Sequence, residues 1–127
     1  LTILSQDASA EIVLLGDFNE DPDEMNVQSL KTVGLTSLME PMLGMEKVGT
    51  YVYRGEDLFY DQIIVSEGLK DKKGLGFDSE SVMILDLPKY RQQEGDYAHY
   101  PFRFWAGNSL LGGYSDHLAV RVTIIKI

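Results

Sequence analysis

The sequence contains no cysteine and only two histidines, His99 and His117. The lack of cysteine excludes thiol nucleophiles, disulfides and cysteine-ligated zinc sites. With two imidazoles, the candidates for a histidine general base are few. Basic residues are also scarce, because 11 Lys and Arg stand against 20 Asp and Glu, which gives a formal net charge of −9. An acidic chain repels polyanions, so nucleic acid is a possible partner that the charge does not favour.

Long apolar runs and low-complexity tracts are absent as well. No apolar stretch approaches the roughly 18 residues that would span a bilayer. The opening LTILSQDASA lacks the basic start and long apolar core of a signal peptide. The chain has 127 residues, of which 44% are hydrophobic, and this is enough for one domain with its own core. We therefore expect residues 1–127 to form a single domain without a membrane span.

The hydrophobic pattern predicts several strands. They are expected over residues 11–16, 50–54, 58–65 and 118–126, with 81–85 as a short strand or a buried loop. The second and third of these runs are separated by a short Gly-Glu-Asp turn, and this spacing predicts a hairpin.

Residues 21–34 carry the signals of a helix at both ends. Asp21 is a candidate N-cap, Pro22 occupies the first helical position, and Glu24 completes a capping-box pattern. Gly34 is a candidate helix end. Strands together with one helix predict an α+β fold, in which a mainly antiparallel sheet carries helix on one face.

Polar side chains inside or just after the apolar strands are the candidates for chemistry. Asp17 and Asn19 follow the first strand in IVLLGDFNED, Asp61 lies within LFYDQIIV, and Asp116 and His117 lie in GGYSDHLAV. A carboxylate in an apolar strand is costly unless a cation, a metal or an imidazole lies beside it. A histidine held by a carboxylate is the usual form of an oriented general base. The structural alternatives stay open: the residues at 17 and 19 cap a turn, and the histidine belongs to the core.

Two other interpretations of these segments fail. DFNEDPD is similar to the start of a calcium-binding loop, but the required Gly and Glu are replaced by Pro22 and Gln28. Ser115, Asp116 and His117 cannot form a hydrolase triad, because neighbouring side chains on an extended segment point to opposite faces. We therefore expect Ser115 to be a turn residue and His99 to be structural.

Three motifs together resemble a known family. GDFN at 16–19, YDQIIVS at 60–66 and YSDHLAV at 114–120 are similar, in order and spacing, to the later motifs of the endonuclease/exonuclease/phosphatase superfamily. Pancreatic-type deoxyribonuclease, abasic-site endonucleases and inositol-phosphate phosphatases belong to that superfamily. The stretches GTYVYRGEDLFYDQIIVS and PFRFWAGNSLLGGYSDHLAV resemble more narrowly its secreted or periplasmic members from gut Bacteroidetes. The resemblance implies a periplasmic or extracellular protein with a four-layer α/β/β/α sandwich.

The resemblance also implies a reaction, the metal-assisted hydrolysis of a phosphoester, with Mg²⁺ as cofactor and Mn²⁺ or Ca²⁺ as alternatives. Asp17 would lie near the attacking water or the leaving group, and Asn19 would hold an oxygen of the scissile phosphate. Asp61 would accept the imidazole N–H and fix its tautomer. His117 would be the general base or a phosphate-stabilising group, and Asp116 would approach a metal ion. Mg²⁺ prefers hard oxygen ligands of this kind and offsets charge that develops at phosphorus.

In the family, the first half of the domain supplies the main metal-ligating Glu, usually in a Gln-Glu pair at a strand end. The pair Gln93–Glu94 lies in a polar segment and is a poor candidate. We therefore expect these residues to form the carboxy-terminal half of the domain, with little activity of their own. An apolar sheet face would then be covered by the missing amino-terminal half or by a second copy of the chain.

The resemblance leaves two questions open. A catalytically inactive fragment, or a non-enzymatic binding module that retains the fold, is the alternative to a hydrolase. The negative charge favours a small phosphoester substrate, such as a sugar phosphate or a lipid head group, over long DNA. Six residues are candidates for a substrate rim, with ordinary core or surface positions as the alternative: Tyr51, Tyr53, Arg54, Arg103, Phe104 and Trp105.

Overall fold

The structure is a computed structural model that describes residues 2–127. The helices, with 3₁₀ helices labelled η, and the strands are α1 (Thr2–Gln6), β1 (Val13–Asp17), α2 (Met25–Ser29), η1 (Leu30–Val33), β2 (Leu35–Ser37), η2 (Glu40–Met42), β3 (Tyr51–Tyr53), β4 (Glu56–Leu58), β5 (Asp61–Ser66), η3 (Glu67–Leu69), β6 (Leu75–Ile84), η4 (Pro88–Tyr90), β7 (Trp105–Ala106), β8 (Ser109–Leu110) and β9 (Val120–Lys126). All strand pairs between these elements are antiparallel, and the predicted α+β class is confirmed.

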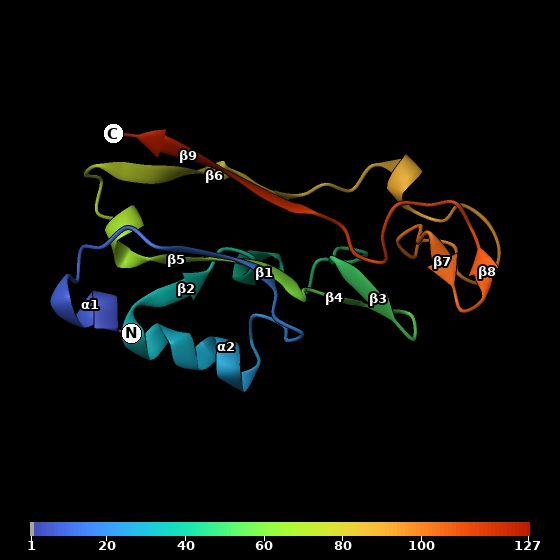
Figure 1. Ribbon diagram of the computed structural model, residues 1–127, viewed down its shortest axis with the longest axis horizontal. Helices are drawn as coiled ribbons and strands as arrows, with labels where there is room; N and C mark the ends of the chain where they lie inside the picture. Colours follow the sequence, from blue (N-terminus) through green and yellow to red (C-terminus); the bar gives the residue numbers. More distant parts are fainter. Residues whose placement is uncertain (1) are drawn as a thin grey trace.

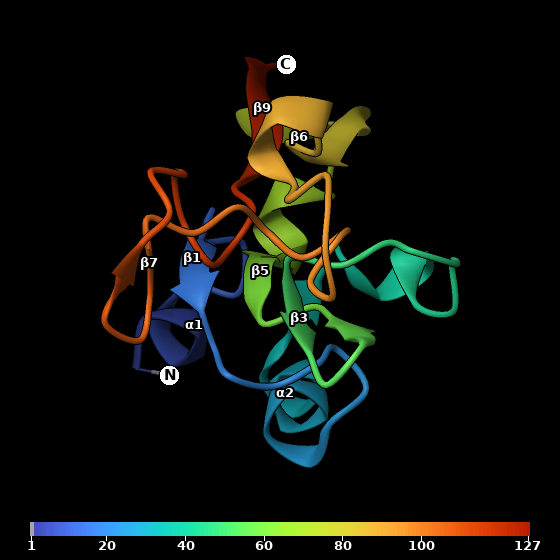
Figure 2. The same ribbon diagram turned by 90° about the vertical axis from the view of Figure 1, so that its right-hand side faces the viewer.

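Strand β5 is the centre of the main sheet, whose order is β1-β5-β2. The strands β6 and β9 form a separate pair that covers one face of this sheet, while α1 and α2 lie against the other face (Figure 1). Figure 2, turned by 90°, shows the same three layers. Because it is covered on both sides, β5 can be apolar at successive positions, whereas a half-exposed strand alternates.

Two hydrophobic clusters hold the layers together. Ile63 and Val65 of β5 point toward β6 and β9, where they pack with Met39, Phe59 and Leu69. Ile64 points the other way and packs with Val27 and Leu35 on the helical side. No helix in the described part of the chain reaches the length and apolarity that a bilayer crossing needs.

The predicted strand over residues 58–65 is divided in the structure. β3 pairs with β4 through a tight turn at Arg54 and Gly55, whose φ angles are both positive, as a two-residue hairpin turn requires. The chain then leaves the hairpin, because the backbone N–H of Phe59 donates to the carboxylate of Asp21. It enters β5, which pairs with β1 and β2. The predicted hairpin therefore forms, but its second strand is β4, whereas most of residues 58–65 belongs to β5 and pairs elsewhere.

The predicted helix is shorter than its signals indicated. α2 begins at Met25, continues as η1, and ends where Gly34 adopts a left-handed φ of 78°. Asp21 does not cap it, because its carboxylate accepts the N–H of Phe59 instead. Half of the capping-box pattern does form, since the Glu24 carboxylate accepts the Asp21 N–H at 2.7 Å. The bond to Phe59, which lies between β4 and β5, therefore displaces the helix start by three residues.

Residues 86–114, here called the arm, extend beyond the ends of β1 and β5 (Figure 1). Arg91 is buried and binds Asp86 through two hydrogen bonds of 2.8 and 2.9 Å, and it donates to the carbonyl of His99 at 2.8 Å. The ring of His99 lies 2.9 Å from Asp57 of β4. These contacts fasten the arm to the β3–β4 hairpin and give His99 the structural role expected of it.

Candidate active site

The carboxyl end of β1 and the start of β5 bring two carboxylates together. Asp17 and Asp61 are direct partners in the antiparallel register. In the next pair, the N–H of Phe18 donates to the carbonyl of Tyr60 at 2.7 Å. Asp17 and Asp61 therefore form a non-hydrogen-bonded pair, in which Cβ atoms lie about 4.5–5.5 Å apart. Like charges placed opposite each other are destabilising, so this pair needs a nearby donor or cation.

His117 supplies a donor to this pair. Its Nδ1 lies 2.6 Å from Oδ2 of Asp61, and both side chains are largely buried. Because a carboxylate only accepts, Nδ1 carries the proton, and in the neutral imidazole Nε2 keeps its lone pair. Nε2 makes no hydrogen bond to any residue between 2 and 127, so it is available to accept a proton from a water molecule. A cavity of about 160 Å³ opens beside His117.

Aromatic rings hold the imidazole from one side. The ring of Tyr51 stacks on His117 with 4.6 Å between centroids, and Tyr60 stacks behind it at 5.5 Å. Desolvation raises the pKa of Tyr60, and the nearby carboxylates of Asp21 and Glu24 raise it further. The phenol of Tyr60 therefore stays protonated at neutral pH. Tyr51, a candidate for the substrate rim, instead positions the histidine.

Thr50 connects β5 to the segment that carries His117, and the sequence pattern did not single it out. It is fully buried, and its hydroxyl accepts the N–H of Asp61 at 3.1 Å. Its carbonyl accepts the N–H of Leu118 at 2.7 Å, and Leu118 directly follows the histidine. The hydroxyl of Ser115 accepts the N–H of His117 at 3.1 Å, so the prediction that Ser115 is a turn residue is confirmed.

Asp17 and Asn19 shape the turn that follows β1. Oδ1 of Asp17 accepts the N–H of Asn19 at 2.9 Å, and Asn19 adopts a left-handed φ of 52° that Asn tolerates better than most residues. Both residues are exposed. Gln62 lies on the opposite face of the sheet from Asp61, where its amide donates to the carbonyl of Glu20. The turn therefore leaves both candidate side chains open to solvent.

Asp116 is exposed and makes no hydrogen bond to another residue of the described chain. Within residues 2–127, no group of three or more His, Asp or Glu side chains is arranged to hold a metal ion. Mg²⁺ demands a near-octahedral set of oxygen ligands. Gln93 does not add to a set, because its side chain donates to backbone carbonyls inside the arm. These residues by themselves therefore do not fit a magnesium site.

The site is thus an imidazole held by a carboxylate, beside a second carboxylate at the open end of a sheet. Such an arrangement can accept a proton from water and can bind an anion once the imidazole is charged. No curated protein and no solved structure matches the chain. The sequence model of the Endonuclease/Exonuclease/phosphatase family matches residues 2–126, a range that includes Asp17, Asp61 and His117. The chain therefore belongs to the endonuclease/exonuclease/phosphatase family.

Proposed function

We propose that this chain supplies half of the active site of a metal-dependent phosphoester hydrolase, as the carboxy-terminal half of a four-layer domain. The reaction would be that of a phosphodiesterase, a nuclease or a phosphatase. The observation that carries the proposal is the 2.6 Å contact between His117 and Asp61, beside Asp17 at the end of the sheet. Membership of a family of phosphoester hydrolases supports it.

In the proposed reaction, Nε2 of His117 accepts a proton from the attacking water or, when it is protonated, donates to a phosphate oxygen. Asp61 keeps the imidazole in the required tautomer and stabilises the imidazolium that forms. Asp17 lies near the water or the leaving group, and Asn19 donates its amide to an oxygen of the scissile phosphate. The exposure of Asp17 and Asn19 at the end of β1 supports these roles.

We further propose that groups outside residues 1–127 complete the site. Asp116 would contribute one ligand to Mg²⁺, or to Mn²⁺ or Ca²⁺, and the other ligands would come from the amino-terminal half of the parent protein. The support is an incomplete metal-ligand set beside an uncovered apolar edge: in β1, Leu15 is 63% exposed and Val13 is 40% exposed. A second copy of the chain is the other candidate for covering this edge.

The proposed substrate is a small phosphoester, because a net charge of −9 disfavours a long polyanion. A periplasmic or extracellular location belongs to the same proposal and follows only from the resemblance. The alternative function, a catalytically inactive fragment or binding module, is favoured by the missing metal ligands. The two functions differ in whether His117 matters for turnover.

Hydrolysis of bis-p-nitrophenyl phosphate and of p-nitrophenyl phosphate with Mg²⁺ or Mn²⁺ tests the proposal. The assay is run on this chain alone and on the parent protein. We expect His117→Ala to lower the parent rate by about 10²- to 10⁴-fold, as the loss of a general base does. His99→Gln is the matched control, because His99 lies in the arm contact. A His117→Ala rate equal to that of the control would contradict the assignment.

A further inference from the structure

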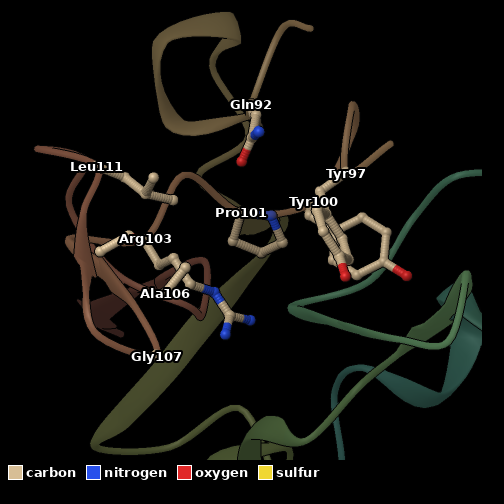
Figure 3. A pocket seen from close by; sticks show the side chains of 9 residues that line it. Gln92, Tyr97, Tyr100, Pro101, Arg103, Ala106, Gly107 and Leu111 are labelled. Atoms are coloured by element: carbon tan, nitrogen blue, oxygen red, sulfur yellow. The ribbon is translucent and has the colours of Figure 1, made fainter. Parts of the chain in front are cut away.

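A cavity of about 550 Å³ lies within the arm, and neither His117 nor Asp61 lines it. Its volume falls within the range of roughly 300–1,000 Å³ that is typical of small-molecule sites. Figure 3 shows the Arg103 guanidinium extending from one side and the rings of Tyr97 and Tyr100 standing on the other. The chain thus contains a concave site of ligand size that is separate from His117 and Asp61.

Arg103 is the one charged residue that lines this cavity. The chain has 20 acidic residues, yet none of them lines it. Across residues 2–127, the guanidinium of Arg103 makes no hydrogen bond and no ion pair, unlike that of Arg91 in the same arm. A guanidinium offers a planar fork of donors that matches phosphate or carboxylate oxygens. The cavity is therefore electrostatically suited to an anion.

The uncharged residues that line the cavity suit the part of a ligand that is attached to the phosphate, such as a sugar ring or a base. The hydroxyl of Tyr100 is fixed, because it accepts the N–H of Gly55 at 2.7 Å. The ring of Tyr97 packs edge-on against Tyr100 and is 61% exposed, so one of its faces is open for stacking. Ser109 adds a hydroxyl to the lining. These groups suit a sugar or a base attached to the anion.

The backbone of Arg103 is tied to the segment that leads to His117. The N–H of Gly113 donates to the carbonyl of Arg103 at 3.2 Å, and the N–H of Tyr114 donates to that of Phe102 at 2.6 Å. The approach requires glycine, because a Cβ at position 113 would lie 2.1 Å from the Phe102 carbonyl oxygen. The four peptide units from Gly113 to His117 span at most about 14 Å between the two Cα atoms. The backbone that carries Arg103 is therefore bound directly to the short segment that precedes His117.

We propose that this cavity is a subsite for a second phosphate group of the substrate, remote from the phosphate that is hydrolysed, and that Arg103 binds it. The substrate class is then a compound in which a sugar ring joins two phosphate groups. The link to hydrolysis rests on the function proposed above, whereas anion binding at Arg103 does not. The arm, on this proposal, selects the substrate that His117 and Asp61 process.

The binding test uses this chain and observes the Arg103 Nε–H resonance by NMR. Inorganic phosphate, ribose 5-phosphate and adenosine 5′-monophosphate are titrated separately. We expect all three to shift this resonance, and we expect Arg103→Gln to weaken binding at least about tenfold, as the loss of a charge-assisted contact does. Tighter binding of the nucleotide than of ribose 5-phosphate would identify a base that stacks on Tyr97, and equal binding would identify a sugar phosphate.

Two variants serve as controls. Arg54→Gln should leave phosphate affinity unchanged, because Arg54 lies over the ring of Tyr53 and outside the cavity. His117→Ala should leave the phosphate affinity measured at the Arg103 resonance unchanged too. Arg103→Lys keeps a point charge but not the fork, so it should bind with intermediate affinity. An Arg103→Gln affinity equal to that of the unmodified chain, or a phosphate shift confined to His117, would overturn the proposal.

The turnover test compares a bisphosphorylated with a monophosphorylated sugar as substrates of the parent protein. Arg103→Gln should lower the ratio of their kcat/KM values about tenfold. An unchanged ratio would overturn the subsite. If neither compound is hydrolysed while phosphate still binds at Arg103, the proposed function fails and the anion site stands.

Discussion

Replacing Arg91 with methionine tests whether the arm is held by the contacts of one buried side chain. Methionine keeps most of the apolar stem of arginine and removes the guanidinium. The guanidinium makes two hydrogen bonds to Asp86 and one to the carbonyl of His99, and it lies 3.9 Å from Asp57. The substitution therefore leaves two carboxylates without their cation.

The expected loss of stability depends on how well each carboxylate can be hydrated once the guanidinium is removed. Removing one partner of a buried ion pair costs about 3–5 kcal/mol. Asp86 has a side chain that is 38% exposed and can rehydrate, whereas that of Asp57 is only 17% exposed and stays beside His99. We therefore expect a loss near the lower limit, about 3 kcal/mol in the free energy of unfolding. For a chain of this size that loss corresponds to a decrease in Tm of about 10 °C or more.

Urea unfolding followed by circular dichroism measures this loss. Lys31→Met is the matched control, because it removes the cation of an exposed ion pair with Glu40 and should cost no more than about 1 kcal/mol. Arg91→Lys should recover only part of the loss, since lysine cannot bind Asp86 through two parallel bonds. If Arg91→Met cost no more than Lys31→Met, the arm would be held by something other than this network.

Two further substitutions test the site and its surroundings. Thr50→Val leaves the N–H of Asp61 without its acceptor, so it should cost about 1–3 kcal/mol in urea unfolding, whereas Thr123→Val, at an exposed position in β9, should change stability by at most about 0.5 kcal/mol. Burial raises the pKa of Asp21 above its ordinary value of 3.8 despite the hydrogen bond from Phe59, and the charges of Glu24 and Asp23 raise it further. The folded state therefore binds a proton on Asp21 more tightly than the unfolded state does. The stabilisation from the protonated Asp21 carboxyl is complete below pH 3.8, and it is lost as the pH rises through the native pKa. Asp21→Asn, which keeps an acceptor for Phe59, should accordingly raise Tm at pH 7 and lose this advantage near pH 3, and a lower Tm at pH 7 would contradict this reasoning.

Local signals predicted the elements that local interactions determine. β1 follows from an apolar run before Gly16, and the helix end at Gly34 follows from the left-handed conformation that glycine adopts at low cost. The division of residues 58–65 could not be predicted from the local pattern. It depends on the bond from Phe59 to Asp21, which lies 38 residues earlier in the chain. The same bond moved the helix start, so one distant contact accounts for both errors.

In the site, too, some residues could be predicted from the sequence and others only from the fold. Asp61 and His117 stood out because they are polar residues in apolar segments, although 56 residues separate them. Thr50 and Arg91 did not stand out, since threonine before a strand and arginine in a polar segment are ordinary at the surface. Only the fold buries them and gives them partners. Residues that support a site are therefore harder to find from sequence than residues that belong to it.

The uncovered edge of β1 lies beside Asp17 of the candidate active site. Leu15 and Asp17 are two residues apart on a strand, so their side chains share a face. A partner that buries Leu15 would consequently lie beside Asp17, and on the proposed function the same contact would bury apolar surface and complete the site. Leu15→Thr should then change the stability of the isolated chain by at most about 0.5 kcal/mol, because the side chain is exposed.

The same substitution should weaken association with the amino-terminal half about tenfold, because it removes about 1.5 kcal/mol of apolar burial. Calorimetric titration of the two halves measures this affinity, and light scattering on the chain alone shows whether a second copy takes the position instead. Tyr53→Thr, at an exposed position of β3, is the matched control. If both variants associate equally well, the edge of β1 is not where the partner binds, and the groups that complete the proposed site must reach it from another side.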